Sequence, residues 1–127
     1  FYPAGHLWLY YPFYVLYTST ENAEHYMKVV HYLMHSAQNM LVSLIGFEYF
    51  ENDAAVSQLI CFVLLANSSV RREESATYND QFMAFFQVLA IYLLLKRKVF
   101  WASLSFSAAL SIKAGAVLML PVFLGTV

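Results

Sequence analysis

The sequence predicts an all-α, polytopic membrane protein, of which this chain is an internal piece. Of its 127 residues, 61% are hydrophobic and only 12% are charged, whereas soluble domains usually carry about 25% charged residues. A chain this short has too high a surface-to-volume ratio to bury so much apolar surface within itself. The few charges also divide the chain into long uncharged runs. Lipid is therefore the expected solvent for much of this surface.

Five uncharged runs predict membrane helices, because about 20 helical residues cross a hydrocarbon core of about 30 Å. The shorter runs can recruit flanking residues, since long cationic side chains reach the interface by snorkelling. The aromatic stretch within residues 1–20 is expected to lie in the membrane interface instead, because Trp and Tyr favour the headgroup level. The expected membrane helices cover residues 26–47, 54–70, 81–95, 99–113 and 114–127.

Helix start signals lie between these runs. Residues 18–21 have the Ser/Thr-x-x-Glu form of a capping box ahead of the first membrane helix. Asn52-Asp53 and Asn79-Asp80 are expected to cap the helices that follow them. No repeat, low-complexity tract or long linker divides the sequence, so we expect one domain.

The basic cluster Lys96–Lys98 sets the expected topology. It lies on a short loop and is expected to be cytoplasmic by the positive-inside bias. One membrane crossing back from this loop, through the helix expected at 81–95, places Asn79 and Asp80 on the luminal side. Because the aromatic stretch is interfacial rather than spanning, the turn at Tyr2–His6 is expected on that luminal side too.

Three places carry candidate binding residues. The Tyr2–His6 turn adjoins aromatic rings on which sugars can pack, although a plain turn before a helix explains it as well. Asn79-Asp80 suits a sugar hydroxyl or a simple helix cap. Lys113 is the only charge in residues 99–127, and an ammonium inside a membrane indicates a functional site. Its natural partner is a lipid-linked phosphate, and snorkelling is the alternative.

Other classes of site are disfavoured. A net charge of −1 argues against nucleic acid, which needs clustered cations. His31 and His35 share a helix face with Gln38 and Asn39, but no third acidic ligand lies at matching depth, so no metal is expected. The single cysteine, Cys61, excludes an internal disulfide. No nucleotide-binding or hydrolase motif is present, so no cofactor is expected.

Three motifs in order resemble one enzyme family. Residues 1–6 resemble the Tyr-Pro-Ala-Gly-His segment of the endoplasmic-reticulum α-1,3-mannosyltransferases that act on dolichol-linked oligosaccharide. Asn79-Asp80 with Met83-Ala84 is similar to that family's Asn-Asp…Ala-Met element. Residues 107–113 are similar to its Ser-Leu-Ala-Val-Ser-Val-Lys element. The spacing also fits, and together the motifs cover nearly the whole chain.

The resemblance implies a GT-C-type transmembrane helix bundle, of which this chain is a part. It also implies a multi-pass protein of the endoplasmic-reticulum membrane. The implied reaction transfers mannose from dolichyl-phosphate-mannose, in α-1,3 linkage, to the dolichol-linked Man5GlcNAc2 precursor of N-glycans. The implied catalytic base is an aspartate upstream of Phe1, so this chain alone is expected to be inactive. The substrate-binding residues implied by the motifs are Tyr2, His6, Asn79, Asp80 and Lys113.

Departures from the family pattern keep alternatives open. Residues 74–78 replace an apolar-Arg-Leu-Phe sequence, and Lys113-Ala114-Gly115 replaces Lys-Met-Asn, so acceptor specificity could differ. One alternative is another lipid-donor mannosyltransferase, such as one that builds glycolipid anchors. The other is a piece of a polytopic transporter, although the internal symmetry typical of transporters is not visible in the sequence.

Overall fold

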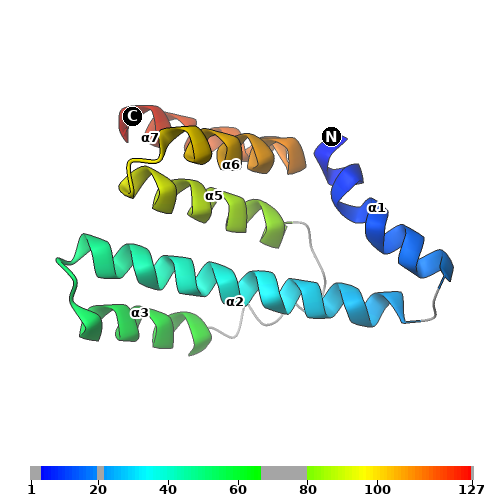
Figure 1. Ribbon diagram of the computed structural model, residues 1–127, viewed down its shortest axis with the longest axis horizontal. Helices are drawn as coiled ribbons and strands as arrows, with labels where there is room; N and C mark the ends of the chain where they lie inside the picture. The colour runs from blue at the N-terminus through cyan, green and yellow to red at the C-terminus, as the bar shows by residue number, and fades with distance from the viewer. Residues whose placement is uncertain (1–3, 20–21, 67–79, 127) are drawn as a thin grey trace.

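The computed structural model describes residues 4–19, 22–66 and 80–126, and within them it is all-helical (Figure 1). The all-α prediction is confirmed for these residues. The elements are α1 (Ala4–Ser19), α2 (Ala23–Tyr49), α3 (Ala54–Ala66), α5 (Asp80–Leu95), α6 (Val99–Ile112), the 3-10 helix η1 (Ala114–Met119) and α7 (Leu120–Thr126).

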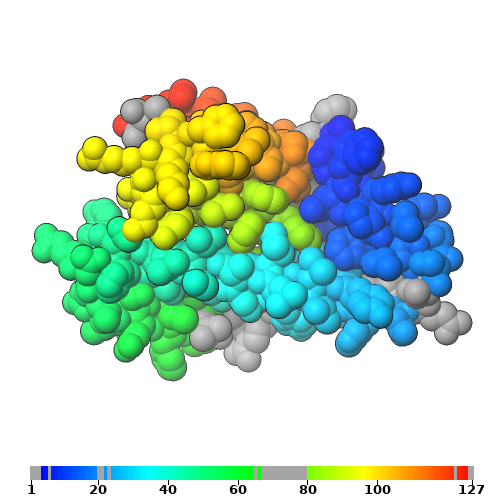
Figure 2. Space-filling model, viewed as in Figure 1, coloured from blue at the N-terminus to red at the C-terminus, as the bar shows by residue number. Residues whose placement is uncertain are grey.

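Helices α3, α2, α5 and α6 lie side by side, and α2 is much longer than its neighbours (Figure 1). The first half of α2 therefore extends past the ends of α5 and α6. Helix α1 lies across those ends and contacts both α6 and α2. In Figure 2 the side chains of α1 abut those of α2 and the final turns of α6. This arrangement brings the start of α1 to the point where α5 begins and α6 ends.

The turn between α2 and α3 follows from its sequence. The backbone N–H of Asn52 donates to the Phe47 carbonyl at 2.8 Å, and Glu51 and Asn52 have φ angles of 55° and 67°. Asp53 Oδ1 then accepts hydrogen bonds from the backbone N–H of Ala55 and of Val56, at 2.8 and 3.3 Å. The prediction that Asn52-Asp53 caps this helix is confirmed, with Asp53 as the capping side chain.

The capping box predicted at residues 18–21 is wrong. Thr18 and Ser19 belong to α1, and their hydroxyls each donate to the Val15 carbonyl, at 2.8 and 2.9 Å. The N-cap of α2 is Asn22, whose side chain makes no capping hydrogen bond. Because α1 continues to Ser19, the hydroxyls satisfy the carbonyls of the preceding turn instead of starting the next helix.

Small residues hold α5 and α6 together. Ala90, Ala102 and Ala109 are at most 1% exposed, and small side chains let two helices approach closely. The Ser105 hydroxyl also donates to the Phe86 carbonyl at 2.8 Å. Helices α2 and α3 have the same kind of link, from the Ser57 hydroxyl to the Ser43 carbonyl at 2.8 Å.

Some polar side chains of these helices are buried, and several large apolar ones are exposed. His31 and Asn39 are 0% and 5% exposed, whereas Phe62, Phe100 and Leu118 are 70% or more exposed. No helix in the described ranges has the length together with the apolar character needed to cross a membrane. Residues 67–70, expected to complete the second membrane helix, lie outside the described residues.

The single helix expected over 114–127 is instead divided into η1 and α7. Lys113 has an extended backbone, with φ −149° and ψ 126°, which ends α6. Pro121 then lies in the first turn of α7, where its missing N–H costs no helical hydrogen bond. No charge lies between η1 and α7, so the uncharged run concealed this division.

Candidate functional site

An ion pair joins the start of α5 to the end of α6. The Lys113 ammonium donates to the Asp80 carboxylate, and both side chains are partly buried. Asp80 lies in the first turn of α5, where the helix dipole favours an anion, and Lys113 follows the last turn of α6, where it favours a cation. Two charged residues that the sequence singled out separately therefore form one polar site.

The α5–α6 hairpin explains why these two residues meet. Residues 96–98 form the tight turn, with Arg97 at a φ of 56°. Asp80 and Lys113 lie almost equally far along the chain from Arg97. In an antiparallel hairpin such positions lie opposite each other, because both helices rise by the same distance per residue. The turn thus fixes the register of the ion pair.

Gly5 joins α1 to this end of the hairpin. A Cβ added at Gly5 would lie 2.6 Å from the Ser111 carbonyl carbon and closer still to the Ser111 carbonyl oxygen and hydroxyl. No side chain fits there without movement of the backbone, so glycine allows the close approach of α1 to α6. The first and third sequence motifs are thereby in direct contact, one turn from Lys113.

An aromatic group lies beside the ion pair. Phe82, which is 3% exposed, contacts Tyr10 of α1 and His31 of α2 edge to face, with ring centroids 6.3 and 4.7 Å apart. Burial, with a smaller contribution from the Asp80 carboxylate, raises the pKa of Tyr10 to about 12. The Tyr10 phenol therefore keeps its proton at neutral pH and can donate a hydrogen bond at this site.

Two amides complete the polar end of the bundle. The Gln81 side-chain N–H donates to the Gln38 side-chain oxygen at 2.6 Å, across the α2–α5 interface. Three consecutive residues of α5 therefore contact its neighbours. Asp80 pairs with Lys113 at the end of α6, and Gln81 bonds Gln38 in the middle of α2. Phe82 contacts one ring of α1 and one of α2. Helices α1, α2, α5 and α6 meet at the first turn of α5.

The comparisons with known proteins identify the family. The sequence model of the ALG3 family, described as ALG3 protein, matches residues 1–127. The chain belongs to the ALG3 family. Comparison with curated proteins and with solved structures gives no match. ALG3-family membership confirms the resemblance of the three motifs, and it supports a mannosyltransferase function in synthesis of the N-glycan precursor.

The structure describes the predicted site residues of this ALG3-family chain to different extents. Asp80 and Lys113 are brought together by the hairpin. His6 lies within α1, one residue after Gly5, and nothing is described of its side chain. Tyr2 and Asn79 lie outside the described residues. The ion pair is therefore the part of the predicted site whose geometry is defined.

His31 and His35 of α2 have partners within their own helix. The His31 Nδ1–H donates to the Met27 carbonyl at 2.9 Å, and the Asn39 side-chain amide donates to His35 Nε2 at 2.8 Å. Among residues 4–19, 22–66 and 80–126, no group of three metal-ligating side chains comes together. These histidines and Asn39 line the interior of the bundle, as polar residues of membrane helices commonly do.

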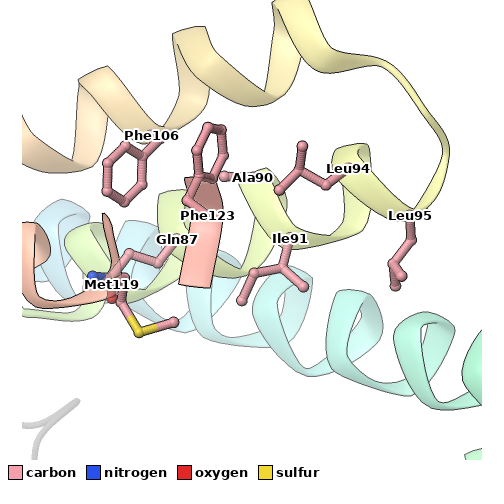
Figure 3. Close-up of a pocket in the computed structure, with 8 residues that line it drawn as sticks. All are labelled: Gln87, Ala90, Ile91, Leu94, Leu95, Phe106, Met119 and Phe123. Carbon is pink, nitrogen blue, oxygen red and sulfur yellow. The ribbon is translucent and has the colours of Figure 1, made fainter. Parts of the chain in front are cut away.

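An apolar cavity lies between α5, α6, η1 and α7 (Figure 3). Its volume is about 180 Å³, and Gln87 is the one polar residue in its lining. Figure 3 shows Phe106 and Phe123 on one side, stacked with ring centroids 4.8 Å apart, and Leu94 and Leu95 near the turn that joins α5 to α6. A cavity of about 150 Å³ with a similar lining takes up a small hydrocarbon.

Proposed function

We propose that the protein transfers mannose from dolichyl-phosphate-mannose to the dolichol-linked Man5GlcNAc2 precursor of N-glycans, in α-1,3 linkage. The observation that carries the proposal is the position of Lys113, paired with Asp80 where the three family motifs converge. The donor is a phosphate ester, so its leaving group is an anion that a preorganised ammonium stabilises.

The proposed reaction is an inverting displacement. The acceptor hydroxyl oxygen bonds to C1 of the donor mannose while the bond from C1 to the phosphate oxygen breaks. The electron pair of that bond stays with dolichyl phosphate, and Lys113 stabilises the resulting charge. The hydroxyl proton passes to a carboxylate, which resemblance to related lipid-donor enzymes assigns to an aspartate outside residues 1–127. The mechanism needs neither a metal nor a cofactor.

The remaining candidates contact the substrates in this proposal. Asn79 and Asp80 orient a sugar, with Asp80 also holding Lys113 in position before the donor arrives. Tyr2 and His6 line the acceptor side. This assignment rests on their motif positions and on the contact between Gly5 and Ser111, which brings the first motif to the ion pair.

We further propose a multi-pass GT-C-type bundle in the endoplasmic-reticulum membrane, with the ion pair on the luminal side. Buried polar and exposed apolar side chains support this placement, since polar groups of membrane helices face the bundle interior. The basic turn at 96–98 favours a cytoplasmic position for the opposite end. Trp8, Tyr11 and Tyr14 of α1 are well exposed and suit the luminal interface.

The apolar cavity is the proposed contact for the hydrocarbon chain of the lipid donor. Replacing Ile91, which lines the cavity, with Trp should fill it and raise the KM for dolichyl-phosphate-mannose about tenfold. Activity toward a donor with only two isoprene units should change less than twofold, because this short chain does not need the cavity. Ala55→Phe, at an exposed position of α3, is the control for a large added side chain. An equal loss with both donors would contradict the lipid contact.

The reaction is tested with the full-length protein in microsomes from cells that lack the endogenous enzyme. Radiolabelled dolichyl-phosphate-mannose and Man5GlcNAc2-PP-dolichol are supplied, and the product is digested with a linkage-specific mannosidase. We expect one added mannose, removable only by an enzyme that cleaves α-1,3 bonds. Transfer from a nucleotide-linked mannose alone, or a product with another linkage, would overturn the proposal.

A further inference from the structure

His31 of α2 is the largest side chain that is fully buried in the described part of the chain. Leu, Ile and Phe usually fill such positions. A buried imidazole costs free energy unless its polar atoms are bonded, and the His31 Nδ1–H donates to the Met27 carbonyl at 2.9 Å. This bond ties the ring to the preceding turn of its own helix. The most deeply buried large side chain is therefore a ring whose orientation is fixed by the backbone.

The ring of His31 supports the start of α5. It packs edge to face against Phe82, with ring centroids 4.7 Å apart and ring planes at 83° to each other. Of residues 80–83, which form the first turn of α5, Phe82 is the one that is buried. Tyr10 of α1 contacts the same ring, with centroids 6.3 Å apart. Aromatic pairs in this geometry contribute more than their buried area alone, so the contact holds Phe82 firmly against α2.

The first turn of α5 needs such support. A helix is least constrained in its first turn, because its first four N–H groups have no partner within the helix. Asp80 lies in this turn, and its carboxylate must keep one position in order to hold Lys113. The ion pair itself and the Gln81 amide bond are only partly buried. The buried contact of Phe82 with His31, two residues from Asp80, is therefore the strongest restraint on the turn.

We propose that His31 is a positioning residue for mannosyl transfer. Through Phe82 it holds the first turn of α5, so that Asp80 keeps the Lys113 ammonium in place before the donor arrives. This inference rests on the proposed function, in which Lys113 stabilises the leaving phosphate. His31 contacts no substrate and transfers no proton. Its loss should lower kcat more than it raises KM, because charge on the phosphate oxygen grows as the bond to C1 breaks.

The test compares His31→Leu with His31→Phe in the full-length protein, in microsomes and normalised to protein amount. Both variants fill the buried position with an apolar side chain, so neither leaves a large cavity. Leucine has no ring edge to meet Phe82, and kcat should fall about three- to tenfold, the range for one aromatic contact. The KM of each substrate should change less than about twofold. Phenylalanine keeps an aromatic edge and should lower kcat less than about twofold.

A double-mutant cycle separates positioning from a purely structural role. In the Lys113→Ala background, His31→Leu should change the rate less than about twofold, because no ammonium remains to be positioned. Asn39→Leu is the matched control, since it places leucine at another buried polar position of α2, whose partner His35 lies in the same helix. Any loss from Asn39→Leu should be the same factor in both backgrounds.

Two results would overturn the inference alone. One is an equal loss from His31→Leu with and without Lys113, and the other is an equal loss from His31→Leu and His31→Phe. If the unmodified protein transfers no mannose from the lipid donor, the proposed function fails and the role of His31 fails with it. That outcome is distinct, because it is seen before any variant is compared.

Discussion

Replacing Lys113 with Ala should lower mannosyl transfer by about a hundredfold or more, the loss typical when one preorganised charge or donor at a reacting group is removed. The leaving phosphate would then lack its cation, and Asp80 would present an unpaired carboxylate to an anionic substrate. The measurement is the rate of transfer in microsomes with the full-length protein, normalised to protein amount. Lys113→Arg keeps the charge and should retain part of the activity.

The opposite end of the bundle supplies the matched control. Lys96 forms an ion pair with Glu48 next to the turn between α5 and α6. Both pairs join a lysine to a carboxylate across helices, but the Lys96 pair is far from the motifs. Lys96→Ala should therefore change the rate less than twofold, because exposed ion pairs contribute about 0–1 kcal/mol to stability. If both alanine variants lose activity equally, the ammonium at Lys113 has no special role.

Replacing Gly5 with Ala should destabilise the docking of α1 by about 1–3 kcal/mol, the range typical of overpacking. The added Cβ meets backbone atoms of Ser111, which cannot rotate away. Because α1 carries the first motif, we expect transfer activity to fall together with resistance to limited proteolysis between α1 and α2. Both are measured on the full-length protein in microsomes.

Other glycines of the chain give the comparison for Gly5. A Cβ at Gly115 or Gly125 meets nothing within 4 Å, so alanine there should change stability by no more than about 0.5 kcal/mol. A Cβ at Gly46 meets only the tip of the Ile60 side chain, which can move. A loss at Gly5 no larger than at Gly115 would show that α1 does not depend on the close approach to α6.

Much of the helical pattern could be predicted from the positions of the charges. The hairpin of α5 and α6 was expected at 81–95 and 99–113, within a residue of its bounds, because Lys96–Lys98 interrupt an apolar stretch. The division of residues 114–127 into η1 and α7 was missed, since no charge separates the two elements and Pro121 lies in the first turn of α7. Charge patterns locate polar interruptions, and this break is apolar.

The site was predictable only in part. The nearly equal separation of Asp80 and Lys113 from Arg97 predicts that they face each other once the hairpin is recognised. The contacts of Gly5 with Ser111 and of Gln38 with Gln81 depend on the rotation of helices that are far apart in the sequence. No local periodicity encodes that rotation, so these contacts required the structure.

The contact between Gly5 and Ser111 also constrains the order of events during biosynthesis. Helix α1 leaves the ribosome before α6, and the surface of α6 on which it docks is made about a hundred residues later. At a synthesis rate of about 5–20 residues per second, α1 waits roughly 5–20 s for that surface. During this interval α2 and lipid are available to shelter the aromatic side chains of α1, but α6 is not. Closure of the site is therefore a late step, after the α5–α6 hairpin has formed.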